Sequence, residues 1–183
     1  MQAAASLNFF PVRAWSTVVT HVERLLEGSS GLVGVALLDV DGFAETARQL
    51  SNRGGDPSAL IDSLAHHFCR QLAPSDFTAR IGDDDLVIVR PSLQAPAEME
   101  GLGLRLVESL QHPLEIDDDQ ISIAISAGVA TSHRGDEAKE LLGYAQFALS
   151  DAKALGRNQL VAFDDEDREL LADIGMDDPA GRR

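Results

Sequence analysis

The sequence predicts an α+β domain, in which a central mixed or antiparallel sheet of about five strands is flanked by helices. Short apolar runs of strand length alternate along the chain with longer segments that carry apolar residues at helical spacing. Two pairs of the strand-like runs are joined by short acidic turns, as in β-hairpins. The chain has 183 residues and a hydrophobic fraction of 44%, which suffices for one buried core.

Helical periodicity marks five segments. The first begins near Trp15, carries a stripe of Val and Leu, and is closed by a Gly-Ser-Ser-Gly turn, so we expect an N-terminal helix there. The expected helices are 13–27, 41–50, 58–72, 95–111 and 141–152.

The strand-like runs are short and rich in Val, Leu and Ile. We expect strands at 31–40, 77–81, 86–90, 113–116, 121–131 and 160–163. The second and third of these form a hairpin closed by the turn at 82–85, and the next two form a hairpin closed by the turn at 117–120.

Three parts of the chain differ in character. Residues 1–30 are expected to be an N-terminal helix and connector, and residues 31–163 a single folded domain. Residues 164–183 are an acidic tail or linker, in which a frayed helix is one alternative.

The charge and composition exclude several functions. The chain has 30 acidic and 15 basic residues, for a formal net charge of −15, so nucleic acid and anionic lipid are not expected partners. No apolar run approaches the roughly 20 residues of a membrane span, and the start lacks the features of a signal peptide, which predicts a cytoplasmic protein without membrane insertion. Cys69 is the only cysteine, which excludes a disulfide framework.

Two acidic groups lie at the ends of expected strands. Asp39 and Asp41 end the buried strand 31–40, and Asp84 and Asp85 lie in the tip of the first hairpin. If the two strands are neighbours, carboxylates from both can meet over one Mg²⁺, a cation that prefers oxygen ligands. The alternative is that these acids are ordinary turn and cap residues.

The order of several motifs makes the chain similar to a known family. Over about residues 31–163 it resembles the GGDEF, or diguanylate cyclase, family. The motifs that carry the resemblance are LLDVDGF (37–43), GGD (54–56), ARIGDDDLVIV (79–89), ISAGVAT (125–131) and SDAKALGRNQLVAF (150–163).

The resemblance implies a palm-like fold and a metal-dependent chemistry. Active members condense two GTP into cyclic di-GMP, with one GTP held by each half of a dimer. Asp39, the Val40 carbonyl and Asp84 match the metal ligands of the family, and Asp85 matches the second catalytic acid of the signature. Mg²⁺ is therefore the implied cofactor.

The resemblance also implies a nucleotide site. Lys153 and Arg157 match the basic pair that holds the triphosphate, and Asp56 matches an acid that contacts the guanine edge. Gly82 matches the first glycine of the signature hairpin, which approaches the nucleotide.

The signature itself is degenerate, since it reads Gly82-Asp83-Asp84-Asp85-Leu86. Asp83 replaces a glycine, so its side chain is expected to crowd the turn and its carboxylate to repel phosphates. Asp85 is one methylene shorter than the usual Glu.

Two further positions depart from the family pattern. Ala47 replaces the Asn that reads guanine. The product-inhibition motif keeps Asp76 but has Ala73 in place of its Arg, which argues against feedback binding of cyclic di-GMP there.

These observations favour a GGDEF domain that is inactive or weakly active and serves as a regulatory or GTP-sensing module in cyclic di-GMP signalling. An active diguanylate cyclase is one alternative, and an interaction or dimerisation module that binds no nucleotide is another. The implied partners are GTP or cyclic di-GMP, a second copy of the chain, and an upstream sensor or downstream EAL domain.

Overall fold

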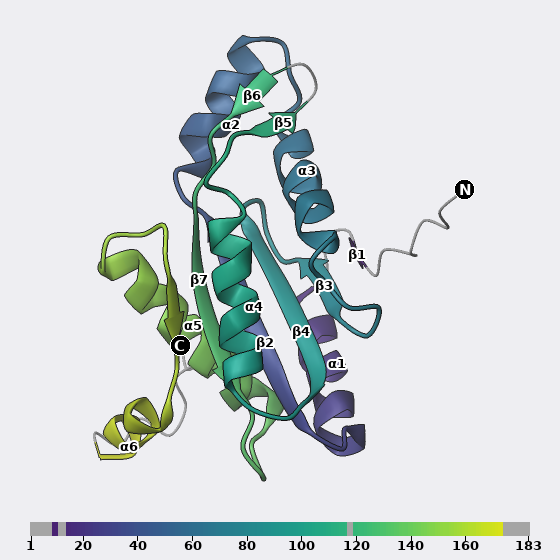
Figure 1. The fold of residues 1–183 in the computed structure, drawn as a ribbon, viewed down its shortest axis with the longest axis vertical. Helices are drawn as coiled ribbons and strands as arrows, with labels where there is room; N and C mark the ends of the chain where they lie inside the picture. Colours follow the sequence, from purple (N-terminus) through teal and green to yellow (C-terminus); the bar gives the residue numbers. More distant parts are fainter. Residues whose placement is uncertain (1–8, 11–13, 117–118, 174–183) are drawn as a thin grey trace.

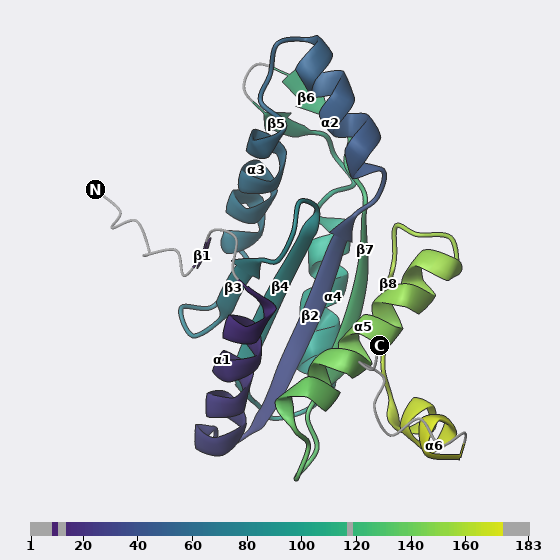
Figure 2. The same ribbon diagram turned by 180° about the vertical axis from the view of Figure 1, so that it is seen from behind.

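The central element is a mixed sheet whose strand order is β1-β3-β4-β2-β7-β8, as Figures 1 and 2 show from opposite sides. The computed structural model describes residues 9–10, 14–116 and 119–173. The strands of this sheet are β1 (Phe9–Phe10), β2 (Leu32–Val40), β3 (Phe77–Arg80), β4 (Asp85–Leu93), β7 (Ile125–Thr131) and β8 (Leu160–Ala162). The pairs β1–β3 and β7–β8 are parallel, and the other pairs are antiparallel.

Helices cover both faces of this sheet. They are α1 (Trp15–Gly28), α2 (Phe43–Asn52), α3 (Ser58–Cys69), α4 (Ala97–Glu108), α5 (Ala138–Ala154) and α6 (Asp165–Asp173). Helix α4 lies across one face, and α1 and α5 lie across the other (Figures 1 and 2). Helices α2 and α3 lie at one end of the sheet beside a separate hairpin of β5 (Leu114–Ile116) and β6 (Asp119–Ile121).

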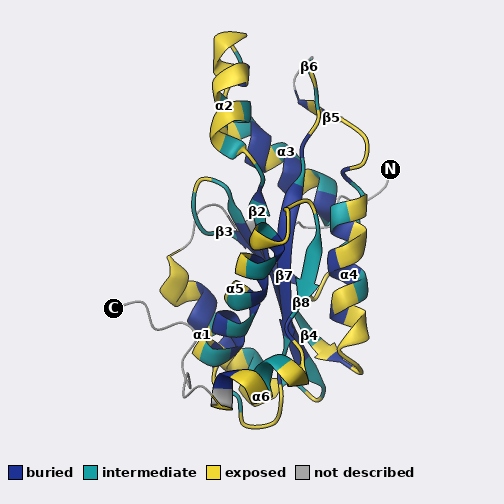
Figure 3. Ribbon diagram, turned by 90° about the vertical axis from the view of Figure 1, so that its left-hand side faces the viewer, coloured by how far each residue is buried: buried dark blue, intermediate teal, exposed yellow. Residues whose placement is uncertain are grey.

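Strand β2 shows why both faces need cover. Its side chains alternate between two apolar clusters, so that Ala36 and Leu38 pack with α3 and α4 while Val35 and Leu37 pack with α1 and α5. This alternation explains the continuous apolar run of the sequence, because a strand buried on both faces has no polar side. Its neighbour β7 is also almost entirely buried and is the dark strand in the centre of Figure 3.

The predicted fold class is confirmed, with two differences in detail. The short edge strand β1 raises the sheet to six strands. The predicted strand 121–131 is wrong as one element, because β6 ends at Ile121 and β7 begins at Ile125. Residues 122–124 cross from the small hairpin to the main sheet, where the Ala124 carbonyl accepts a hydrogen bond from the Asp41 N–H.

The ends of the described chain pack on the sheet. Val18 and Val22 of α1 are buried, and so is Leu171 of α6, which forms part of the predicted acidic tail. The domain boundaries at 30 and 163 stay predictions. Asp117 and Asp118 of the expected acidic turn lie outside the described residues.

Among the residues that the structure describes, no helix is long and apolar enough to cross a membrane.

Gly128 is where β7 meets α5 most closely. A Cβ added there would lie 2.1 Å from the Leu149 nitrogen and 2.3 Å from the Ala145 oxygen, both backbone atoms of α5. We expect Gly128→Ala to lower the free energy of unfolding by about 2 kcal/mol or more, because the helix must move away from the sheet. Urea unfolding measures the change.

Gly101→Ala is the matched control for this prediction. Gly101 lies in α4, where an added Cβ would meet only the end of the Arg105 side chain at 3.5 Å. We expect this variant to be stabilised by about 0.5–1 kcal/mol through helix propensity. Equal stability of the two variants would contradict the close packing of β7 and α5.

Candidate functional site

Three carboxylates meet where β2 ends beside the start of β4. In the antiparallel pairing of these strands Asp39 lies opposite Asp85, and Asp84 precedes Asp85 in the hairpin turn. One carboxylate oxygen of each residue lies within 4.8 Å of the other two. Asp39 and Asp84, 45 positions apart in the sequence (84 minus 39), therefore belong to one cluster with Asp85, whereas Asp41 is not part of it.

The cluster raises the pKa of Asp85 to about 6. Burial of the carboxyl is the largest cause, and the negative charges of Asp84 and Asp39 add to it, whereas the ammonium group of Lys153 acts in the opposite direction. Like charges held this close favour a bound cation or a shared proton.

Lys153 reaches the cluster from the last turn of α5. Its Nζ donates a hydrogen bond of 2.6 Å to Asp39 Oδ2, and the Asp39 side chain is only 14% exposed. The resemblance to the family assigns Lys153 to a triphosphate. In this structure its ammonium group neutralises part of the acidic cluster.

Arg157 lies beside the cluster in a tight turn after α5. The turn has Arg157 and Asn158 in the left-handed region, with φ of 66° and 48°. Asp41 holds it, since one carboxylate oxygen accepts the Asn158 N–H at 2.9 Å and the other lies 3.8 Å from Arg157 Nε. Ser126 of β7 donates a hydrogen bond of 2.7 Å to the same Asp41 carboxylate.

Asp41 thus has a role of its own, which the sequence reasoning missed. It lies two positions after Asp39 and fixes the backbone that carries Arg157. Strand alternation could indicate only that Asp41 shares a face with Asp39, since residues i and i+2 lie on the same side; it could not identify the distant partners of Asp41.

The signature turn is held by Arg80, a second residue that the sequence reasoning missed. Its guanidinium donates to the Gly82 and Asp83 carbonyls at 2.6 and 3.0 Å, and the Ile81 N–H donates to the Asp85 carbonyl. The Asp83 side chain is 94% exposed and 3.6 Å from Arg80, and its backbone is outside the left-handed region. The expected crowding of the turn by Asp83 is therefore not seen, although its charge stays at the turn.

The Val40 peptide ties β2 to the same turn, because its N–H donates to the Asp84 carbonyl at 3.1 Å. Gly82 lies close to the cluster, since a Cβ added there would be 3.7 Å from Asp85 Oδ2. The predicted site residues of β2, the hairpin and α5 are therefore brought together.

Asp56 lies apart, at the start of α3. Its two carboxylate oxygens accept the Ser58 N–H at 2.9 Å and the Ser58 hydroxyl at 2.6 Å, which lowers the pKa of Asp56. These bonds cap the exposed first turn of the helix. The guanine contact implied by the resemblance stays a prediction.

Asp76 has a structural role. Its side chain is buried and accepts two hydrogen bonds from Arg90, at 2.9 and 2.5 Å, and a third from the Ala73 N–H at 2.7 Å. Both oxygens are thus engaged within the domain. The expectation that no cyclic di-GMP is held there stays a prediction.

The donor atoms of the cluster suit Mg²⁺. Opposite ligands of an octahedral Mg²⁺ lie about 4.2 Å apart and adjacent ligands about 3.0 Å, so oxygens within 4.8 Å of one another could reach one ion by moving closer together. Asp39 and Asp84 would hold such an ion, with Asp85 beside it, and the ion would supply charge for bound phosphates and acidify an attacking hydroxyl.

The fold and the cluster together define a palm-like α+β domain with an acidic site at the end of its central strands. The family profile described as "Diguanylate cyclase, GGDEF domain" matches residues 16–159. The chain therefore belongs to the GGDEF domain family.

Individual relatives carry different printed activities. The chain is 30% identical over 154 residues to the cyclic di-GMP phosphodiesterase NbdA of Pseudomonas aeruginosa, covering 84% of this chain and 19% of the relative. It is 30% identical over 132 residues to the diguanylate cyclase DgcP of the same species, covering 69% of this chain and 18% of the relative. The chain thus spans about a fifth of each of these proteins.

A solved structure shows the same fold. The crystal structure of the GGDEF domain of TpbB, also called YfiN, from Pseudomonas aeruginosa superposes with a TM-score of 0.74 at 21% identity. The match covers 88% of this chain and 99% of that domain.

The raised pKa of Asp85 predicts a pH-dependent stability. The pKa is about 6 in the folded domain, against an ordinary value of 3.8, so the folded state is penalised as the pH rises from about 4 through 6. We expect Asp85→Asn to be more stable than the natural chain by about 1 kcal/mol at pH 7, after allowance for solvent screening, and by less at pH 4.5. Denaturant unfolding at the two pH values measures the difference.

Asp83→Asn is the control, because Asp83 is a neighbouring carboxylate on the same turn that is almost fully exposed. Its effect on stability should be small and nearly the same at both pH values. A gain for Asp85→Asn that does not grow with pH would contradict the electrostatic origin.

The ion pair of Asp76 predicts a large loss of stability. Asp76→Asn leaves the Arg90 guanidinium, which is only 16% exposed, without its counter-ion. We expect the free energy of unfolding to fall by about 3 kcal/mol. Asp62→Asn, an exposed change on α3, should stay within about 0.5 kcal/mol of the natural chain in the same urea titration.

Proposed function

We propose that this domain binds GTP together with Mg²⁺ and converts it to cyclic di-GMP weakly or not at all, so that it serves as a regulatory or GTP-sensing module in cyclic di-GMP signalling. The observation that carries the proposal is the convergence of Asp39, Asp84 and Asp85 with Lys153. Carboxylates that can bind a metal ion and an ammonium group that can bind phosphates lie together at the end of β2. A metal-bound triphosphate requires both.

In this proposal the acidic residues bind the metal ion and the basic residues bind the phosphates. Asp39 and Asp84, with the Val40 carbonyl, would hold the metal ion, and Asp85 would act beside them. Lys153 would leave Asp39 when metal replaces it and would pair with phosphate oxygens. Arg157 would do the same from the turn that Asp41 holds.

Three observations support weak or absent turnover. Ala47 leaves Asp56 without a second polar group to read guanine, and a site that lacks one of two hydrogen-bonding partners selects its base poorly. The exposed Asp83 adds a negative charge at the turn that phosphates approach. Asp85 is shorter than Glu, and a misplacement of about 1 Å costs on the order of a hundredfold in rate.

A second candidate function is an active diguanylate cyclase. The carboxylate cluster favours it, because acids suited to two-metal chemistry are in place. DgcP, a relative of similar identity, carries the name of this activity.

Titration of the purified chain with GTP, with and without Mg²⁺, separates these functions. We expect calorimetric binding that depends on Mg²⁺ and no accumulation of cyclic di-GMP in the same samples. Robust formation of cyclic di-GMP would establish the second candidate. Absence of any binding would overturn the proposal in favour of an interaction module without nucleotide.

Partners of the domain are also part of the proposal. Condensation of two GTP needs two such sites facing each other, so a homodimer accompanies any activity. The chain spans about a fifth of NbdA and DgcP, which leaves room in proteins of that kind for sensor or EAL domains.

The ion pair of Lys153 with Asp39 predicts that replacing the lysine raises the affinity for metal and lowers the affinity for GTP. Lys153→Met frees the Asp39 carboxylate, so the affinity of the nucleotide-free domain for Mn²⁺, a spectroscopic substitute for Mg²⁺, should rise by about tenfold. The affinity for GTP should fall by about tenfold, since the triphosphate loses a cation. Electron paramagnetic resonance measures the first change and calorimetry the second.

Lys139→Met is the matched control, because Lys139 is the other lysine of the chain and lies exposed on the same helix. It should change neither affinity. A loss of both affinities in Lys153→Met would contradict competition between the ammonium group and the metal.

A further inference from the structure

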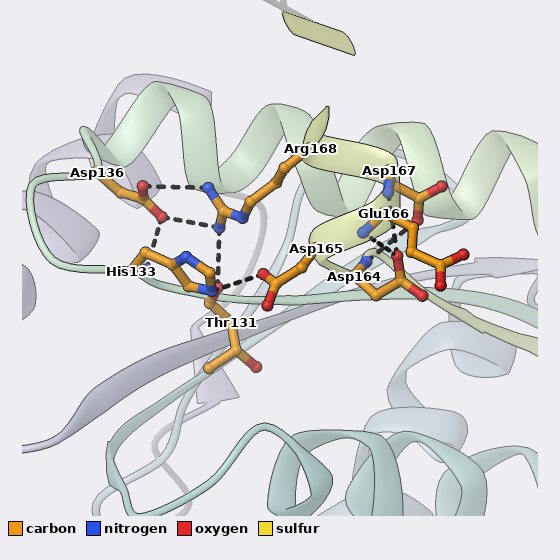
Figure 4. A network of polar contacts seen from close by, with 8 residues as sticks. All are labelled: Thr131, His133, Asp136, Asp164, Asp165, Glu166, Asp167 and Arg168. Carbon is orange, nitrogen blue, oxygen red and sulfur yellow. Dashed lines mark hydrogen bonds and ion pairs between the residues drawn. The ribbon is translucent and has the colours of Figure 1, made fainter. Parts of the chain in front are cut away.

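Arg168 makes one of the contacts that hold helix α6 to the domain, beside the buried Leu171 and the ion pair of His133 with Asp165. Arg168 forms a two-pronged ion pair with Asp136, at 3.2 and 2.9 Å, and donates a third hydrogen bond of 3.1 Å to the Thr131 carbonyl (Figure 4). Its guanidinium also stacks on the Tyr144 ring, 4.4 Å from the centroid. The two charged side chains are 18% and 11% exposed, so water screens this pair little.

The same contacts hold the end of β8. Phe163 follows this strand directly, is buried, and stacks on Tyr144 with ring centroids 4.4 Å apart. The Phe163 N–H donates to the Val129 carbonyl at 2.8 Å. The Arg168 guanidinium lies 5.8 Å from the centroid of the Phe163 ring. The contacts of Arg168, which we call the Arg168 clamp, and the end of β8 therefore belong to one aromatic cluster.

The turn that contains Arg157 and Asn158 lies at the other end of β8. Asn158, two residues before the strand, donates its N–H to Asp41, and Arg157 precedes it. Strand β8 lies at the edge of the sheet and pairs only with β7 among the described strands, through three residue pairs. It is therefore a short strand held between an anchor at Asp41 and an anchor at Phe163.

The turn has a strained backbone. Two successive residues other than glycine, Arg157 and Asn158, have positive φ, which costs about 1–2 kcal/mol at Arg157 and less at Asn158, because asparagine tolerates the left-handed region. Conformations of this kind persist only where the surrounding structure fixes them. If β8 were free to slide or fray, the turn would relax and the Arg157 side chain would lose its place beside Asp41.

We propose that Arg168 is a positioning residue for the nucleotide site, because its clamp on Asp136, Thr131 and Tyr144 fixes β8 and so keeps Arg157 in the strained turn. The proposal rests on the proposed function, in which Arg157 contacts the triphosphate. A protein segment that displaced α6 from this clamp would weaken nucleotide binding from the far end of β8.

A double-mutant cycle in the full chain tests the coupling. Arg168→Ala should weaken Mg²⁺-GTP binding about fivefold, Arg157→Ala should weaken it about tenfold, and the double variant should bind no more weakly than Arg157→Ala alone. Calorimetry measures the four affinities. Additive losses would overturn the proposal, because they would show that Arg168 does not act through Arg157.

Amide hydrogen exchange provides a readout that does not depend on nucleotide. The Arg157 and Asn158 amides, which donate to Ala152 and Asp41, should exchange at least about tenfold faster in Arg168→Ala. Unchanged exchange at these amides would overturn the proposal. If the natural chain binds no GTP, the proposed function fails while this measurement still decides the coupling.

Two further variants complete the experiment. Glu169→Ala changes an exposed neighbour on α6 and should alter neither affinity nor exchange. Arg168→Lys keeps the charge but loses the two-pronged geometry and the stacking, so its effects should lie between those of the natural chain and Arg168→Ala. An effect of Glu169→Ala as large as that of Arg168→Ala would also overturn the proposal.

Discussion

The pairing of β2 with β4 places two carboxylates opposite each other, and the rest of the site depends on this constraint. Asp39 faces Asp85 at the end of a register that continues through Leu38 and Leu86. Like charges across a strand pair are destabilising. The apolar pairs behind them fix the register, because a shift of one residue would turn every buried side chain of β2 to the other face.

The repulsion at this strand end is offset by parts of the chain far away in sequence. Helix α5 brings Lys153 to Asp39, and it can do so because Gly128 lets the helix lie against β7. Arg80 secures the signature turn from β3. The cluster is thus tolerated in the folded domain at the expense of stability, which is the usual relation between a functional site and its fold.

The sequence predicted the architecture well and the details of the site in part. Periodicity and turn chemistry identified the sheet and its helices, because buried strands and amphipathic helices have clear patterns. The same patterns failed at residues 122–124, where alternating Ile residues continue past the strand end as the chain crosses between two sheets. The roles of Asp41 and Arg168 could not be predicted, since each depends on partners brought close only by the tertiary fold.

The departures from the family signature act through charge more than through shape. Asp83 fits its turn without strain and points to solvent, so the backbone of the hairpin is not deformed by the missing glycine. What changes is the balance of charge, because Asp83 adds an exposed carboxylate to the turn that carries Asp84 and Asp85, while the ammonium group of Lys153 is already paired with Asp39. In the proposed function, a metal–nucleotide complex would have to draw Lys153 away from Asp39 and bring its phosphates close to Asp83. Both steps would oppose phosphate binding at the signature turn while leaving the fold intact, which is the physical argument for proposing a domain that binds this complex and turns it over poorly.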